Sequence, residues 1–190
     1  KQQLDWMLLD YDSHRQMQQF VRDLNHFYLA HACLWQVEDS WDGFNWLAHD
    51  DHARNIIVFR RIDDNGDDLV VVCNFAPVTR EDYRIGVPDA TSYDEVFNTD
   101  DVKYGGSGVV NRGAIRVKNQ PDHDMKQSIT ITVPPLAAVF LKGRPRRTEK
   151  AVRAKNHGQK GREGPGRKAC CEERAQETPK AGDLSHQQRG

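Results

Sequence analysis

The apolar positions between residues 13 and 28 recur with the period of an α-helix. They fall close to the i, i+3, i+4, i+7 stripe of one helix face, and they are Met17, Phe20, Val21, Leu24, Phe27 and Tyr28. Ser13 has a side chain that commonly caps a helix N-terminus, so we expect the helix to begin there. A face this apolar needs a large surface to pack against.

Beyond Leu34 the pattern changes to short β-branched or alternating runs separated by turns. The strand-like stretches are residues 56–59, 69–75, 83–87, 93–97, 114–117, 128–133 and 136–141. Between the first two, Asn65-Gly66 predicts a hairpin, because both residue types tolerate positive φ. Short strands with frequent turns indicate a mainly β fold, an antiparallel β-sandwich preceded by one or two α-helices.

Residues 143–190 have a different composition from the rest of the chain. They include no aromatic residue and are rich in Arg, Lys, Gly, Glu and Gln. Such a segment buries too little apolar area to offset the entropy of ordering, so we expect a disordered basic tail. The predicted domains are therefore helices at 1–34, an all-β domain at 35–142 and the tail at 143–190.

Charge is divided unevenly along the chain. Residues 1–142 contain 22 acidic and 14 basic residues, whereas residues 143–190 contain 6 acidic and 13 basic residues. An acidic body has no electrostatic reason to bind nucleic acid, although binding of an acidic polymer by the tail stays open as an alternative. No apolar run approaches the roughly 20 residues of a membrane helix, so we expect neither nucleic acid nor membrane as a partner.

Cysteine spacing argues against a metal centre. Cys33 and Cys73 sit in apolar stretches typical of core residues, and no CxxC pair exists. A disulfide between them stays open, but a free pair in a cytoplasmic protein is the favoured interpretation. We expect no metal ion and no cofactor.

Four polar segments resemble functional motifs only in part, and each has a structural explanation that we favour. Residues 47–52, with a His-Asp pair, are predicted to be a polar turn between strands, and residues 63–68 lack the Glu that closes a calcium loop. Residues 104–108 lack the Gly-Lys-Ser/Thr ending of a phosphate loop, which favours a flexible connection. Residues 122–124 are predicted to be a solvated loop.

An aromatic cluster at residues 41–46 is the strongest candidate for a binding site. Trp46 is the first choice, with Phe44 and Trp41 beside it and the polar Asp42 and Asn45 between them. Sugar rings stack on flat aromatic rings, while neighbouring polar groups bind their hydroxyls. The alternative is that these aromatic residues only cap the junction between helix and sandwich.

The chain also resembles the bacterial 1,4-α-glucan (glycogen) branching enzymes of glycoside hydrolase family 13. The resemblance is carried by eight ordered stretches over about 140 residues, and these are 4–9, 20–25, 43–46, 72–78, 82–88, 95–100, 104–108 and 128–141. Among them are Leu4-Asp5-Trp6, Asn74-Phe75-Ala76-Pro77 and Asp82-Tyr83-Arg84-Ile85-Gly86. The chain departs from many relatives at Asp12 and Gln16, where Pro and Gly are common, and this puts the local turn in doubt.

What the resemblance implies is a transglycosylase whose site lies on a (β/α)₈ barrel. An Asp nucleophile, a Glu acid/base and a second Asp would cleave an α-1,4 linkage, and the 6-hydroxyl of another glucose unit would form an α-1,6 branch. In the family these carboxylates precede the Leu4-Asp5-Trp6 stretch. We therefore expect a C-terminal fragment with no catalytic residue, whose start is a cut end within the last barrel helices.

The partners that the resemblance implies are an α-glucan, such as glycogen or amylose, and the missing catalytic barrel. The implied location is cytoplasmic. Two alternatives stay open: a non-catalytic glucan-binding β-domain, and the end domain of a related trehalose-forming or debranching enzyme. The His49-Asp50 and Asn25-His26 pairs resemble catalytic motifs of the family, but their positions or spacing do not fit.

Overall fold

The structure is a computed structural model that describes residues 5–146. The predicted tail lies outside this range from residue 147 onward. Within the described range, no helix is long and apolar enough to cross a membrane.

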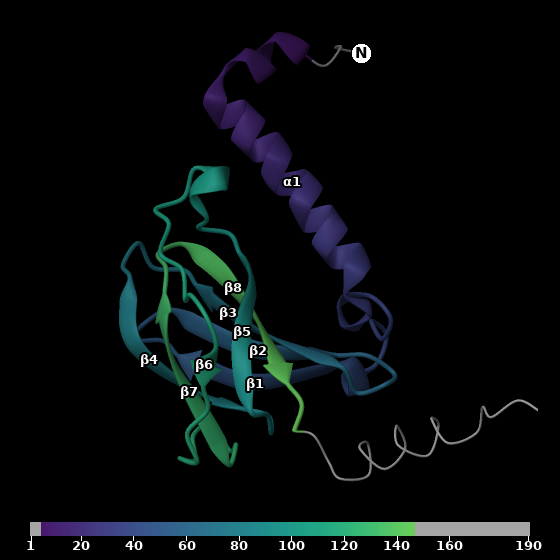
Figure 1. Cartoon of the computed structure of the whole chain (residues 1–190), viewed down its shortest axis with the longest axis vertical. Coiled ribbons are helices and arrows are strands. Elements are labelled where there is room, and N and C mark those ends of the chain that lie inside the picture. The colour runs from purple at the N-terminus through teal and green to yellow at the C-terminus, as the bar shows by residue number, and fades with distance from the viewer. Residues whose placement is uncertain (1–4, 147–190) are drawn as a thin grey trace, which may run out of the picture. The chain divides into compact units, whose positions relative to one another are not determined.

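One α-helix precedes the strands of the chain (Figure 1). The helical elements are η1 (Trp6–Asp10), α1 (Asp12–Ala30), η2 (Ala32–Leu34), η3 (Trp41–Gly43) and η4 (Val102–Tyr104). The strands are β1 (Phe44–Asp51), β2 (Ile56–Ile62), β3 (Asp68–Asn74), β4 (Arg80–Val87), β5 (Ser92–Asn98), β6 (Ile115–Arg116), β7 (Gln127–Val133) and β8 (Ala137–Arg144).

The strands form two antiparallel sheets, which confirms the predicted sandwich. The larger sheet has the order β1-β2-β3-β8-β5-β6, and the smaller one pairs β4 with β7. Side chains of the two sheets meet in one buried cluster, with Val58 and Val72 from the larger sheet and Ile85 and Ile129 from the smaller. Alternate residues of β2, β3, β4, β7 and β8 thus point into the core, as a period of two requires.

The other face of the larger sheet carries a second apolar cluster, on which α1 packs. Phe27 is buried there against Phe97 and Phe140, with ring centroids 4.8 and 5.2 Å apart, and Phe20 and Leu24 pack around the same cluster. If the chain is the end of a barrel enzyme, Met17, Phe20, Leu24 and Tyr28 are expected to pack on that barrel. For Phe20 and Leu24 this is wrong, because the sandwich itself supplies the surface, whereas Met17 and Tyr28 remain exposed.

Two local predictions also fail. Ser13 does not cap the helix, since α1 begins at Asp12 and its N-cap, Tyr11, makes no side-chain capping bond. Strand β1 covers residues 44–51, part of which was predicted to be a turn. Its burial pattern does not alternate, because the pairing with β2 shifts register twice, between Trp46 and Ala48 and again before Asp51.

The hairpin between β2 and β3 is confirmed, but with a different turn geometry. Of the two turn residues, Gly66 has a positive φ of 80°, whereas Asn65 does not. The Asp63 carboxylate accepts hydrogen bonds from the backbone N of Asn65 and of Asp67, at 2.9 and 2.8 Å. Asp63, in the acidic segment 63–68, therefore stabilises the turn between β2 and β3.

Candidate functional site

The predicted aromatic site is brought together at the start of β1. Phe44 lies in the middle, with its ring centroid 6.0 Å from that of Trp41 and 4.9 Å from that of Trp46, both edge-on. Phe59 on β2, which the sequence analysis did not select, stacks on Phe44 with centroids 5.4 Å apart. Trp41 is 77% exposed and Trp46 is 47% exposed, so two indole rings of the cluster are accessible to solvent.

The chain before the aromatic cluster is held by one arginine. The Arg61 guanidinium donates to the carbonyl oxygens of Cys33, Leu34 and Val37, at 3.3, 3.2 and 3.2 Å. Gly43 lies so close to this segment that a Cβ would be 2.1 Å from the Val37 oxygen. The connection into β1 is therefore fixed by packing, which fixes the direction of the aromatic side chains.

Polar groups accompany the rings as expected. Ser40 caps η3 by accepting a hydrogen bond from the backbone N of Asp42 at 3.1 Å, and its hydroxyl donates to the Asp42 carboxylate at 3.0 Å. Asn45 is exposed beside Trp46, and the His49 ring lies 6.2 Å from the Trp46 ring. Two rings with amide, carboxylate and imidazole groups around them match the chemistry of a sugar-binding surface.

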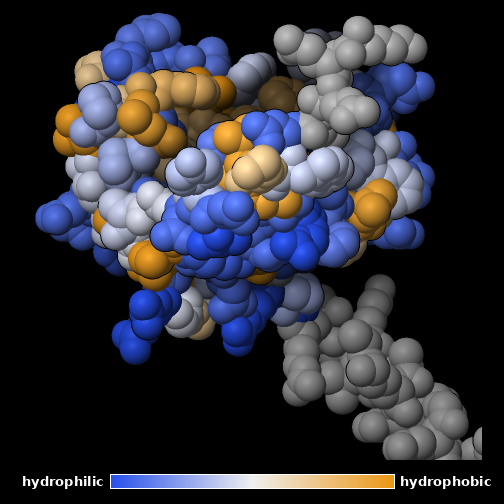
Figure 2. All heavy atoms as spheres, turned by 90° about the horizontal axis from the view of Figure 1, so that it is seen from above, coloured by the Kyte–Doolittle hydropathy of each residue, from blue (hydrophilic) through white to orange (hydrophobic). Residues whose placement is uncertain are grey.

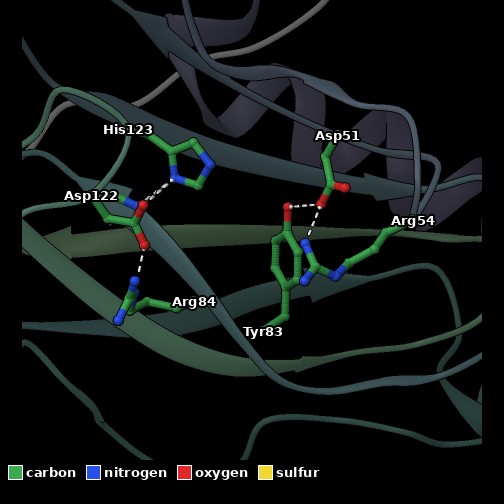
Figure 3. A network of polar contacts seen from close by, with 7 residues as sticks. Asp51, Arg54, Tyr83, Arg84, Asp122 and His123 are labelled. Carbon is green, nitrogen blue, oxygen red and sulfur yellow. Dashed lines mark hydrogen bonds and ion pairs between the residues drawn. The ribbon is translucent and has the colours of Figure 1, made fainter.

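A second polar arrangement lies where β1 meets β4 (Figure 3). Tyr83 Oη donates a hydrogen bond of 2.9 Å to Asp51 Oδ2, and Arg54 Nη1 donates to the same oxygen at 3.1 Å. The Arg54 guanidinium also lies over the Tyr83 ring, 5.8 Å from its centroid. Asp51 was expected in a turn, but it ends β1 and faces the other sheet.

The electrostatics of this pair follow from its burial and its hydrogen bonds. Burial raises the pKa of Tyr83 far above its ordinary value, and the bond to Asp51 raises it further. Burial alone would also raise the pKa of Asp51, but the bonds from Tyr83 and Arg54 outweigh it and hold this pKa below its ordinary value. Tyr83 is thus a permanent donor and Asp51 a permanent carboxylate near neutral pH.

Residues 122–124 belong to the same region. Asp122 Oδ2 accepts a hydrogen bond of 2.6 Å from Arg84 Nε, and His123 Nδ1 lies 3.2 Å from Asp122 Oδ1 (Figure 3). The turn crosses β4 at Gly86, where a Cβ would be 1.9 Å from the Asp122 carbonyl oxygen. This segment was expected to be a solvated loop, but Asp122 and His123 are half-buried and bonded to β4, while Asp124 is exposed.

The loop at 104–108 is also more organised than expected. The Asp100 carboxylate is buried and accepts from the backbone N of Ser107 at 2.9 Å, the Ser107 hydroxyl at 2.6 Å and the backbone N of Val109 at 3.1 Å. Gly106 packs against the Asp100 backbone, where a Cβ would lie 2.2 Å from its oxygen. Gly106 thus permits close packing of this loop on Asp100.

The cysteines and acidic residues give no sign of a metal centre in the part of the chain that the structure describes. Cys33 and Cys73 are both free thiols, and burial raises the pKa of each. No group of three or more His, Cys, Asp or Glu side chains between residues 5 and 146 is placed to hold a metal ion.

Comparisons with known proteins agree with this architecture. Residues 46–144 match the family described as alpha amylase, C-terminal all-beta domain. The chain is 48% identical over 143 residues to 1,4-alpha-glucan branching enzyme GlgB of Halothermothrix orenii, covering 75% of this chain and 23% of that protein. For the same enzyme of Francisella tularensis subsp. novicida, identity is 44% over 143 residues, covering 74% of this chain and 22% of the other.

The chain was also compared with a third branching enzyme and with one solved structure. The branching enzyme GlgB of Aquifex aeolicus is 43% identical over 140 residues, covering 73% of this chain and 22% of that protein. The crystal structure of alpha-amylase from H. orenii aligns with a TM-score of 0.40 and 18% identity, covering 66% of this chain and 20% of that one. The chain spans less than a quarter of the length of these branching enzymes. It belongs to the alpha amylase C-terminal all-beta domain family and is related to the bacterial 1,4-alpha-glucan branching enzymes.

Proposed function

We propose that this chain serves as the C-terminal domain of a 1,4-α-glucan branching enzyme, which forms α-1,6 branches in glycogen. The observation that carries the proposal is the 48% identity to such an enzyme over 143 residues, three quarters of the chain. The reaction would take place on a catalytic barrel outside the present sequence. In this proposal residues 35–142 are the all-β domain, and residues 1–34 contribute the terminal helices.

The proposed partner of the helical segment is the catalytic barrel. While Phe20, Leu24 and Phe27 pack on the sandwich, other apolar side chains of η1 and α1 remain exposed, namely Trp6, Met7, Met17, Val21 and Leu29. Apolar residues are visible among the hydrophilic ones on the face drawn in Figure 2. A helix with one apolar face on the sandwich and a second one exposed is suited to join two domains.

The proposed ligand of the aromatic cluster is the α-glucan itself. Trp46 and Trp41 supply exposed indole faces, and Phe44 and Phe59 support them from the sheet. In this role the domain holds a glucan chain while the barrel performs the transfer. Glycogen synthesis implies a cytoplasmic location, which fits the free thiols of Cys33 and Cys73.

A domain exchange tests the enzymatic assignment. The 143 matching residues of the H. orenii branching enzyme are replaced by the corresponding segment of this chain, and branching is followed by the loss of iodine colour from amylose. We expect the hybrid to branch amylose. The present chain alone should leave the colour unchanged, because the catalytic carboxylates of the family precede it. An inactive but folded hybrid would contradict the assignment.

Affinity electrophoresis tests the glucan contact separately. The 190-residue chain should be retarded in a gel that contains glycogen, and Trp46→Ala should remove most of that retardation, since stacking on an indole contributes much of the binding of a sugar ring. Trp6→Ala, at another exposed tryptophan, is the matched control and should migrate like the unchanged chain. Equal retardation of all three would refute a contact at Trp46.

A further inference from the structure

A polar groove of about 800 Å³ opens where the two sheets have free edges. It lies between β1 and β4, each of which pairs with a neighbour on one side only. Its walls come from three separate segments, the end of β1 with the following turn, the first half of β4 and the turn at 122–123. The aromatic cluster at residues 41–46 does not contribute to its lining.

Donors and acceptors in the groove are held in fixed positions before any ligand arrives. Asp51 is held by Tyr83 and Arg54, and Asp122 is held by Arg84. The side chains of Arg54 and Arg84 are about half exposed, and each guanidinium uses only one nitrogen on its carboxylate, which leaves N–H groups for a ligand. Binding therefore requires little ordering of side chains, which favours recognition.

Backbone strain is concentrated in the same place. Five non-glycine residues in the described part of the chain have positive φ, and four of them, Asn55, Asp82, His123 and Asp124, lie in or next to the three segments of the groove. Asp82 sits at an irregularity in the pairing of β4 with β7, between Arg80 and Tyr83. Strained residues and bulges often mark sites where side chains are aimed at a ligand.

One arginine in the groove has unused donors. Arg80 Nη2 donates to the Arg54 carbonyl oxygen at 3.4 Å, and the buried Arg80 Nε has no acceptor among the described residues. A buried donor without an acceptor is unfavourable, and a ligand oxygen that shifts this guanidinium into the groove would relieve it.

The charges of the lining select the class of ligand. Five carboxylates (Asp50, Asp51, Glu81, Asp82 and Asp122) face three guanidinium groups, so an anion would meet net negative charge. Three carboxylates or histidines do not converge here as a metal site would require, within the described residues. A neutral polyhydroxylated molecule suits the groove, because each hydroxyl can donate to a carboxylate and accept from a guanidinium.

We propose that this groove between β1 and β4 is a carbohydrate-binding site distinct from the aromatic cluster. Sugar hydroxyls bind to the carboxylates of Asp51 and Asp122 and to the guanidinium groups of Arg54 and Arg84. The choice of an α-glucan as the natural ligand rests on the proposed function, whereas the groove's preference for a neutral sugar rests on its own lining.

The test is an NMR titration of the full ¹⁵N-labelled chain with maltotriose. We expect the backbone amide signals of Arg54, Asp82 and His123 to shift together and to saturate with one dissociation constant. Arg84→Gln should weaken this binding about ten-fold, because a charge-assisted donor is lost and Asp122 is freed. Arg144→Gln removes an ion pair with Asp94 that lies outside the groove lining, and it should leave the binding unchanged.

Titrations with two further ligands, and with the variants Trp46→Ala and Arg84→Gln, distinguish the possible results. Cellotriose shows whether the groove takes glucose chains in general, and sodium phosphate shows whether it takes anions instead. Absence of shifts with both sugars, or shifts with phosphate alone, would overturn the proposal. Trp46→Ala should leave the groove shifts intact, so failure of the aromatic site and failure of the groove are distinguishable. Unchanged groove binding in a folded Arg84→Gln chain would also overturn it.

Discussion

The hydroxyl of Tyr83 donates a hydrogen bond of 2.9 Å to Asp51 Oδ2, joining the two sheets at their free edges. Tyr83 lies on β4 with its ring in the core cluster, and Asp51 is the last residue of β1. The side chain of Asp51 is 12% exposed, so this polar contact is mostly buried but still borders the groove. It both closes the core and fixes one wall of the groove.

Tyr83→Phe should lower the free energy of unfolding by about 1 kcal/mol, the usual contribution of one hydrogen bond. The ring stays in the core, so only the hydroxyl and its bond to Asp51 are lost. Urea unfolding at pH 7 measures the change. Tyr11→Phe is the control, since Tyr11 is exposed, and it should change the value by less than about 0.5 kcal/mol. Equal stability of both variants would refute the importance of the bond.

The same variant should show a pH-dependent difference from the unchanged chain. Because the pKa of Asp51 is lowered in the folded state, its ionised form contributes stability above its ordinary pKa of about 3.9, and this is lost as pH falls through the folded-state value. The destabilisation by Tyr83→Phe should therefore be constant from pH 7 to about 5 and shrink below about pH 4. Urea unfolding across this range tests it, and a gap that widens in acid would contradict it.

Phe27→Ala should loosen the attachment of α1 to the sandwich. Phe27 is the one buried residue of the helix and contacts both Phe97 and Phe140, so its truncation should cost about 3–5 kcal/mol. Hydrogen exchange should show lost amide protection in α1 while β3 keeps its own.

Leu29→Ala is the matched control for this helix. Leu29 is 69% exposed on α1, so its truncation should leave amide protection in the helix nearly unchanged. If both variants lose protection equally, then α1 is not held by the Phe27 contacts.

The elements that the sequence predicted well are those whose pattern is local. Strand β7 alternates cleanly, β3 is a β-branched run, and α1 has a clear apolar stripe. Strand β1 was missed because register shifts interrupt its alternation. The packing partner of α1 was missed for a different reason. A helix face shows that it will be buried, but only the tertiary structure shows on what surface.

A site could be predicted from the sequence only where its residues lie close together along the chain. Trp41, Phe44 and Trp46 lie within six residues, so a sequence pattern was enough to select them. The groove joins Asp51 to a residue 32 positions away and Arg84 to one 38 positions away. No local signal links such residues, and the pairing of strands alone brings them together.

Asp100→Asn should destabilise the loop that follows β5. The Asp100 carboxylate accepts three hydrogen bonds from Ser107 and Val109, whereas an amide has one acceptor oxygen and would turn a donor toward another donor. We expect a loss of about 2 kcal/mol in the free energy of unfolding, measured by urea. Asp39→Asn, at an exposed position, removes the same charge and should have little effect. Equal losses would point to net charge rather than to the loop.

Asp23→Asn should weaken the polar link between α1 and η4. Asp23 Oδ2 accepts a hydrogen bond from Tyr104 Oη at 2.8 Å and lies 3.3 Å from Lys103 Nζ. The bond from Tyr104 is the main reason that the pKa of Asp23 is lowered.

A lowered folded-state pKa of Asp23 means that the stabilisation is present above the ordinary pKa of about 3.9 and disappears as pH falls through the folded value. Amide exchange in α1 should therefore be faster in the variant at pH 7. In thermal unfolding, the difference between the two chains should shrink as pH falls below the ordinary pKa of about 3.9, because Asp23 of the unchanged chain is then progressively protonated. Asp12→Asn removes an exposed carboxylate from the first turn of the same helix, where it pairs with Arg15 but makes no contact with η4, and it should exchange nearly like the unchanged chain. Identical exchange in all three would mean that the apolar contacts alone hold the helix.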